Sequence, residues 1–146
     1  MKGYLLDTNL LIALLWPSHA QHAGAVKWFT RHRGRGWATC PMTEAGFVRI
    51  VSNPAFSRDA VRPIDATRVL AANTVAKDHV FWADDRPFAE GVAFAAARLV
   101  GHQQVTDAYL LGLAIFSGGA LATLDRGIEG LIAPKGPEQK ALEVVT

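Results

Sequence analysis

The chain has 146 residues, half of them hydrophobic, and its 15 lysines and arginines against 13 aspartates and glutamates give a formal net charge of +2. This length and composition predict one globular domain, residues 1–146, and exclude a disordered or low-complexity protein. No run reaches the ~18 uncharged apolar residues of a membrane span. The single cysteine, Cys40, excludes an intrachain disulfide and fits a reducing compartment. We therefore expect a cytoplasmic protein without a membrane association.

Short apolar runs alternate with stretches of helical periodicity along the chain. In chain order we expect a strand at 3–6, helices at 8–16 and 18–32, a strand at 37–40, helices at 43–51 and 65–76, a strand at 79–83, helices at 87–100 and 107–116, and strands at 120–124 and 142–145. Ser18, Thr43 and Thr106 are the expected helix N-caps, and Pro87 suits a first helical turn. The alternation predicts an α/β fold with a mainly parallel sheet.

Two aspartates follow predicted strands. Asp7 comes directly after the apolar run that ends at Leu6, and Asp125 comes after the run that ends at Leu124. Short apolar runs of this kind are typical of fully buried parallel strands, so both carboxylates are expected at strand carboxyl ends. That edge is where open α/β sheets bind ligands. Each aspartate also has a simpler interpretation as a turn or cap residue.

Two further acids stand in the first turns of predicted helices. Glu44 shares a helical stripe with Phe47, Val48 and Val51, and Asp107 heads a similar apolar stripe. An acid at the head of an apolar stripe points inward, where an unpaired charge is costly. First-turn acids also occur at solvent-exposed helix starts, so each one alone is ambiguous. Their occurrence beside two strand-end aspartates favours a shared site.

Four carboxylates in one cleft repel one another unless a cation lies between them. The sequence therefore predicts a divalent metal site, with Mg²⁺ or Mn²⁺ as the ion because both prefer oxygen ligands. The expected catalytic metal ligands are Asp7, Glu44, Asp107 and Asp125. Thr8, Asn9 and Thr123 are expected to support them through side-chain hydrogen bonds.

Other polar clusters are less specific. Arg31, Arg33 and Arg35 are expected either to bind RNA phosphates or to form a solvated basic loop. His19 and His22 have helical spacing but no third ligand nearby, which favours a solvated helix start over a zinc site. Asp84 and Asp85 fit a turn before Pro87 better than a metal role.

The ordered set of motifs resembles the PIN domain, and the short single-domain form is similar to the VapC toxins of bacterial and archaeal toxin–antitoxin pairs. The matching segments are 5–9, 43–44 with Arg49 and 52–54 downstream, 105–108 and 123–127. The resemblance implies a three-layer α/β/α sandwich whose acidic metal positions fall on the four acids above. It also implies one or two metal ions, RNA products with a 5′-phosphate and a 3′-hydroxyl, an antitoxin partner whose tail enters the cleft, and a homodimer.

The sequence therefore favours a metal-dependent endoribonuclease, the toxin of a VapBC-type pair. Two alternatives remain open. A metal-free PIN-like module would bind nucleic acid or a partner without cleaving anything. A metal-dependent phosphatase of the haloacid-dehalogenase type also places an aspartate after its first strand, but a second aspartate typically follows two residues on, where this chain has Asn9.

Overall fold

The computed structural model describes residues 1–146 and contains a sheet of five strands. The strand order is β3-β2-β1-β4-β5, and every neighbouring pair is parallel. The strands are β1 (Tyr4–Leu6), β2 (Trp37–Thr39), β3 (His79–Phe81), β4 (Ala120–Thr123) and β5 (Leu142–Val144). The sheet confirms the predicted parallel α/β fold, including the edge strand near the C-terminus.

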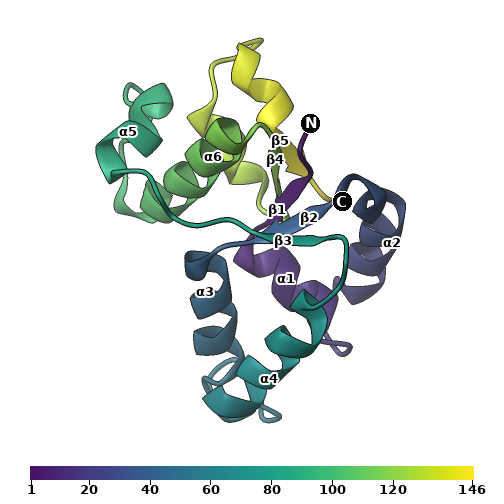
Figure 1. Ribbon diagram of the computed structural model, residues 1–146. Coiled ribbons are helices and arrows are strands. Elements are labelled where there is room, and N and C mark those ends of the chain that lie inside the picture. The colour runs from purple at the N-terminus through teal and green to yellow at the C-terminus, as the bar shows by residue number, and fades with distance from the viewer.

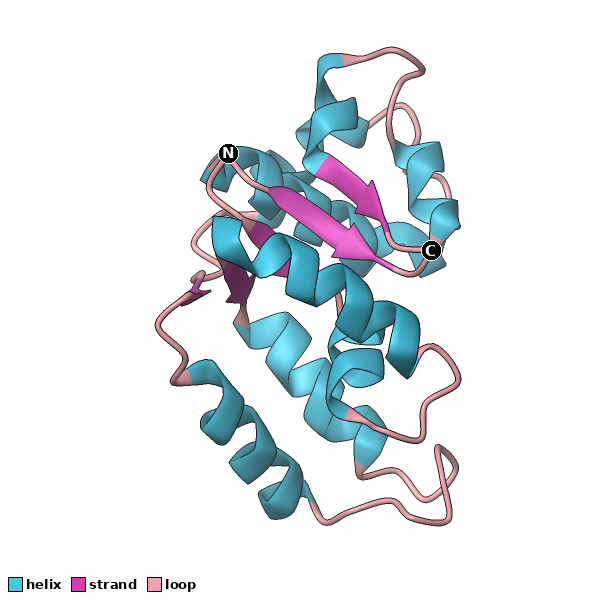
Figure 2. Cartoon of the chain, turned by 90° about the vertical axis from the view of Figure 1, so that its right-hand side faces the viewer, coloured by secondary structure: helices cyan, strands magenta, loops and turns pink.

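Helices cover both faces of this sheet, so the predicted three-layer α/β/α sandwich is confirmed (Figure 1 and Figure 2). On one side lie α1 (Thr8–Leu15), α2 (His22–His32), α3 (Pro41–Val51) and α4 (Pro63–Thr74). On the other side lie α5 (Phe88–Val92), α6 (Val105–Ser117) and most of the 3₁₀ turns, at Ala93–Ala95, His102–Gln104, Arg126–Leu131 and Pro137–Ala141. No helix combines the length and the apolar character that crossing a membrane requires.

Two hydrophobic cores form because successive strand residues point to opposite faces of the sheet. Tyr4 and Leu6 of β1 pack into the core beneath α1 to α4, whereas Leu5 packs into the core beneath α5 and α6. All three are buried. Strands covered on both faces are continuous apolar runs rather than alternating ones, which is why β1 was recognisable in the sequence.

The order of the strands locates the edge of the sheet at which a ligand is expected to bind. From β1 the chain proceeds outward through β2 to β3, and it then returns to the other side of β1 to form β4 and β5. The direction of strand addition therefore reverses between β1 and β4. In open α/β sheets, ligands bind outside the carboxyl ends of the strands at such a switch point. Asp7 and Asp125 follow the two strands that flank it.

The three predicted helix N-caps, Ser18, Thr43 and Thr106, are wrong. Helix α2 begins at His22 rather than after Ser18, because residues 17–21 form turns. Helix α3 begins at Pro41, with Cys40 at the N-cap, and the hydroxyl of Thr43 accepts the Cys40 N–H at 3.0 Å from inside the first turn. A proline is favourable at the first helical position because its missing N–H would have no partner there. Helix α6 begins at Val105, so Thr106 lies within it.

The predicted helix at 87–100 is also wrong. Helix α5 ends at Val92 and continues only as the 3₁₀ turn Ala93–Ala95. The alanine-rich sequence favours a longer helix, but α5 crosses α6 at very close range. A Cβ atom on Gly112 of α6 would lie 1.8 Å from the Gly91 carbonyl oxygen. Tertiary packing of this kind overrides local propensity.

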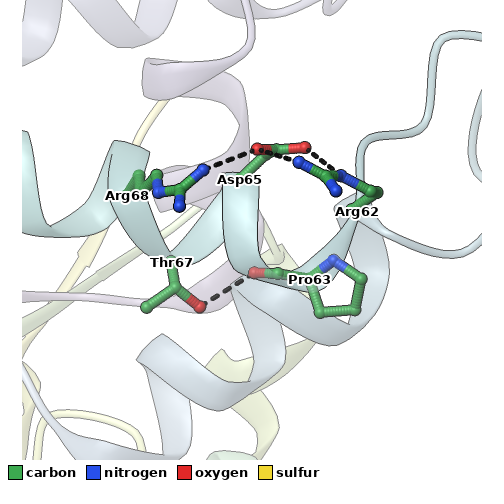
Figure 3. Close-up of polar contacts among 5 residues, drawn as sticks. All are labelled: Arg62, Pro63, Asp65, Thr67 and Arg68. Atoms are coloured by element: carbon green, nitrogen blue, oxygen red, sulfur yellow. Dashed lines mark hydrogen bonds and ion pairs between the residues drawn. The ribbon is translucent and has the colours of Figure 1, made fainter.

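Polar contacts define the start of α4, which begins at Pro63 rather than at Asp65 (Figure 3). Asp65 accepts hydrogen bonds from Arg62 at 2.9 Å and from Arg68 at 3.4 Å. The Thr67 hydroxyl donates to the Pro63 carbonyl at 2.8 Å. Exposed ion pairs of this kind contribute little stability. They do pair the guanidinium groups of both Arg62 and Arg68 with Asp65.

Candidate active site

Asp7 lies at the carboxyl end of β1 and is the N-cap residue of α1. It is only 5% exposed. One carboxylate oxygen accepts the Thr8 backbone N–H at 2.8 Å, and the other accepts the Thr123 hydroxyl at 2.7 Å. Burial raises the pKa of Asp7, the two hydrogen bonds oppose that increase, and the nearby Asp125 adds to it. The result is a fixed, poorly solvated carboxylate at the ligand-binding edge.

A hydrogen-bond network ties the end of β1 to the end of β4. The Asn9 amide donates to the Thr123 hydroxyl oxygen at 3.2 Å, and its carbonyl accepts the Leu124 N–H at 3.0 Å. The Thr123 oxygen also accepts the Asp125 N–H at 3.0 Å. Asn9 and Thr123 therefore orient Asp7 and the backbone of Asp125 together. The Thr8 side chain packs instead against Gly46, where an added Cβ would meet its hydroxyl oxygen at 2.8 Å.

Asp107 and Asp125 complete a cluster of three carboxylates. Asp107 lies half-buried in the first turn of α6, and its pKa is raised to about 6, first by burial and then by the charges of Asp7 and Asp125. Asp125 is exposed, and its carboxylate accepts the Gly127 N–H at 2.8 Å. Repulsion from Asp125 contributes to the raised pKa values of both Asp7 and Asp107. Mutual repulsion of this kind is relieved by a bound cation.

Asp7 and Asp107 line a cleft of about 380 Å³. Its walls come from the end of β1, from α1, from the loop after α1, from α3 and from the start of α6. The remaining lining residues are Thr8, Asn9, Ile12, His19, Met42, Gly46, Arg49, Ile50, Phe56 and Thr106. His19 was considered from the sequence only for a zinc site, and Arg49 only as part of the family motif, so neither residue was given a role beside the aspartates. Only the packing of α1 and α3 brings them to this cleft.

Glu44 is not brought into this cleft, contrary to the prediction. On α3 the cleft face carries Met42 and Gly46, and Glu44 lies about 200° around the helix from both, at about 100° per residue. Its carboxylate accepts the Thr39 hydroxyl at 2.6 Å, and the same hydroxyl oxygen lies 2.8 Å from His79 Nε2. The Glu44 side chain does point inward, as its place on the apolar stripe predicted, but it points toward β2 and β3 rather than toward Asp7.

The acidic cluster fits a magnesium-type ion by its donor chemistry. No three His, Cys, Asp or Glu side chains converge closely enough to ligate one ion together. Mg²⁺ does not require this, because it is typically held through one or two carboxylates while waters and substrate phosphates fill the other positions. Asp7 and Asp107 supply two such carboxylates in the cleft.

Comparison with known proteins shows which family has this fold and sequence. A family model described as the PIN domain matches residues 4–131. This chain belongs to the PIN-domain family. It is 46% identical to ribonuclease VapC39 of Mycobacterium tuberculosis over 124 residues, which cover 85% of this chain and 89% of the relative. It is also 46% identical to ribonuclease VapC38 of the same species over 135 residues, with coverage of 91% and 94%.

Solved structures show the same fold. A crystal structure from Pyrobaculum aerophilum matches this PIN domain with a TM-score of 0.61 at 24% identity, covering 97% of this chain and 83% of that one. The crystal structure of Mycobacterium tuberculosis VapC20, described as a sarcin–ricin loop cleaving toxin, matches with a TM-score of 0.59 at 15% identity. It covers 87% of this chain and 93% of that one.

The predicted RNA-binding arginines lie at the other end of this PIN domain's sheet. Arg31 ends α2, while Arg33 and Arg35 form the 3₁₀ turn before β2, at the amino edge of the strands. The Arg33 guanidinium is paired with Asp78 at 2.6 Å and lies over the Phe29 ring. None of the three arginines lines the acidic cleft.

Asp84 and Asp85 follow β3 and are exposed, and neither lines the cleft of this PIN domain. Their position matches a solvent-exposed connection between β3 and α5.

Replacing Asn9 with alanine is expected to lower metal affinity and RNA cleavage by about 10–100-fold, the usual cost of removing a group that orients a metal ligand. The change leaves the Leu124 N–H and the Thr123 hydroxyl oxygen without their Asn9 partner. Mn²⁺ titration and cleavage rates of purified Asn9→Ala protein check this. Unchanged affinity and rate would show that the network between β1 and β4 does not orient the site.

Proposed function

We propose that this chain is a Mg²⁺- or Mn²⁺-dependent endoribonuclease and the toxin of a VapBC-type toxin–antitoxin pair. The observation that carries the proposal is the cluster of Asp7, Asp107 and Asp125 at the sheet's switch point, where burial first and repulsion between the carboxylates second raise the pKa values of Asp7 and Asp107. Similarity to VapC ribonucleases over most of the chain supports RNA as the substrate.

In the proposed mechanism, Asp7 and Asp107 hold the ion, and Thr123 and Asn9 hold Asp7 and the Asp125 backbone in position. An ion held there would activate water for attack and neutralise charge on the phosphate. Attack of water on phosphorus breaks the bond to the 3′-oxygen, which takes up a proton. The products are a 5′-phosphate and a 3′-hydroxyl. Glu44 is left out of the proposed ligands because it bonds Thr39 outside the cleft.

The direct test is digestion of mixed cellular RNA by the purified chain with Mg²⁺ or Mn²⁺, with EDTA as the control. We expect discrete cuts that require the metal and leave 5′-phosphates. Release of phosphate from phosphomonoesters without RNA cuts would favour the phosphatase alternative. A folded protein that binds RNA and cuts nothing would favour a binding module.

We also propose an antitoxin partner and a homodimer, as the resemblance to VapC toxins implies. The three acidic side chains of the site would accept a cationic side chain from the antitoxin tail, which would compete with metal and so inhibit cleavage. Co-purification of the toxin with the product of an adjacent small gene, and the mass of the complex, test both parts. We place this activity in the cytoplasm, where single unpaired cysteines such as Cys40 stay reduced.

The raised pKa of Asp107 predicts a pH dependence of stability. The folded state keeps a proton on Asp107 up to a pKa of about 6, above the ordinary aspartate value of 3.8. The folded state therefore binds more protons than the unfolded state in this window, so the Asp107 contribution to stability falls as pH rises from the lower to the higher pKa. In EDTA, Asp107→Asn protein should lose less stability than wild type across this range. Parallel thermal melts check this, and identical pH profiles would contradict it.

A further inference from the structure

Arg49 is the only arginine or lysine that lines the acidic cleft. It lies on α3, one turn beyond Gly46 and next to Ile50, and it forms none of the ion pairs found in the chain. Five other arginines do form ion pairs, as Arg62 and Arg68 do with Asp65 (Figure 3). Arg49 lines the same cleft as Asp7 and Asp107 and pairs with neither, so its charge is available to a ligand that carries negative charge.

His19 faces the same cleft from the loop between α1 and α2. Its Nδ1 accepts the Gln21 backbone N–H at 3.0 Å, so the neutral ring carries its proton on Nε2. That nitrogen has no partner within the chain. His22 has a different role, because its Nδ1 donates to the Ala13 carbonyl at 2.8 Å and fastens α2 to α1. Of the two histidines, only His19 presents a free donor to the cleft.

Apolar side chains form the part of the cleft wall around His19 and Arg49. Ile12, Ile50 and Phe56 line the cleft, and the Phe56 ring is fixed edge-to-face against Trp16 with ring centroids 5.2 Å apart. Hydrogen bonds and charges act more strongly beside such a wall than in bulk water. At about 380 Å³ the cleft falls within the range of small-ligand sites, which suits one nucleotide unit rather than a duplex.

We propose that Arg49 and His19 form a phosphate-binding subsite that holds single-stranded RNA opposite the aspartates. Arg49 supplies the positive charge and a planar donor fork, and His19 Nε2 donates one neutral hydrogen bond to the same phosphate group. The inference rests on the proposed ribonuclease function. In this proposal the substrate phosphate is bound in the cleft itself. It is not bound by Arg31, Arg33 and Arg35, which lie at the amino edge of the sheet.

The test measures RNA binding rather than cleavage. A fluorescently labelled single-stranded RNA that spans a wild-type cut site is titrated into Asp7→Asn protein, which is expected not to cleave it, at several salt concentrations. Adding Arg49→Ala should weaken binding about tenfold and reduce the slope of log affinity against log salt by about 0.7, the value for one phosphate contact on a single strand. Arg49→Lys should restore the slope. His19→Ala should weaken binding by about 2–10-fold without changing the slope, because its donor is neutral.

Two variants serve as matched controls in the same background. Arg98→Ala removes an exposed arginine outside the cleft that has no ion pair, and His22→Gln removes the structural histidine. Both should bind RNA as the background protein does. Equal affinities and slopes for Arg49→Ala and Arg98→Ala, in a protein whose wild type cuts RNA, would overturn the subsite alone. A wild-type chain that neither binds nor cuts RNA would overturn the proposed function together with the subsite.

Discussion

Replacing Asp7 with asparagine is expected to lower RNA cleavage by at least about 10³-fold, because the change removes a metal-binding charge worth several kcal/mol in the transition state. Asparagine has nearly the same shape and keeps an oxygen for the Thr8 N–H. Burial already disfavours the Asp7 charge, as its raised pKa shows, so the variant should fold at least as stably as wild type in the absence of metal. Cleavage rates and thermal melts of the two proteins check both parts.

Glu44→Gln is the matched control for this prediction. It also replaces a carboxylate by an amide, and its remaining oxygen can still accept the Thr39 hydroxyl outside the cleft. Near-wild-type cleavage by Glu44→Gln, together with loss of cleavage in Asp7→Asn, is the expected pair of results. Equal cleavage by Asp7→Asn and wild-type protein would show that the chemistry lies elsewhere.

Replacing Gly112 with alanine is expected to destabilise the chain by at least about 3 kcal/mol, a large part of the ~5–15 kcal/mol that stabilises a typical domain. The added Cβ would lie 1.8 Å from the Gly91 carbonyl oxygen, and both contacting groups belong to helices. Neither helix can yield by rotating a side chain, so α5 and α6 must separate. Because α6 carries Asp107, the damage should also reach the cleft.

Urea unfolding measures this effect, and Gly24→Ala provides the contrast. A Cβ on Gly24, in α2, would meet nothing within 4 Å, so that substitution should be neutral or stabilising by up to about 1 kcal/mol. Similar unfolding midpoints for the two variants would contradict the tight crossing of α5 and α6.

The sequence predicted best where one local pattern determines position. Buried parallel strands are continuous apolar runs, so Tyr4–Leu6 and Ala120–Thr123 identified both the sheet and the edge where Asp7 and Asp125 emerge. Asn9 and Thr123 were also expected to support the aspartates; the Thr123 hydroxyl donates directly to Asp7, and Asn9 in turn hydrogen-bonds Thr123. The parallel α/β/α sandwich is confirmed by the structure, and the PIN-domain family by the matching family model and relatives.

Glu44 illustrates where local patterns fail. Helical periodicity correctly placed it on the stripe of Phe47 and Val51, but a stripe does not specify what lies opposite. The direction depends on how α3 packs against the sheet, and this packing places Glu44 beside Thr39 of β2. Gly46 faces Thr8 in the cleft, and a glycine carries no side-chain signal that reports such a contact.

Contacts between distant segments explain the remaining differences. His19 lies in a turn between α1 and α2, and Arg49 on the third helix, so only the folded arrangement of α1, α2 and α3 brings them to one cleft. The premature end of α5 depends likewise on the crossing at Gly91 and Gly112, which no local propensity encodes.

The most direct test of the acidic cluster as a metal centre is a Mn²⁺ titration of the purified chain, followed by electron paramagnetic resonance. Wild type, Asp7→Asn, Asp107→Asn and Glu44→Gln would be compared under the same conditions. We predict that wild type and Glu44→Gln bind Mn²⁺ with similar affinity, and that each aspartate variant binds at least about 10-fold more weakly. Loss of Mn²⁺ binding in Glu44→Gln, with retention in Asp7→Asn or Asp107→Asn, would contradict a centre built from the aspartates at the switch point of the sheet.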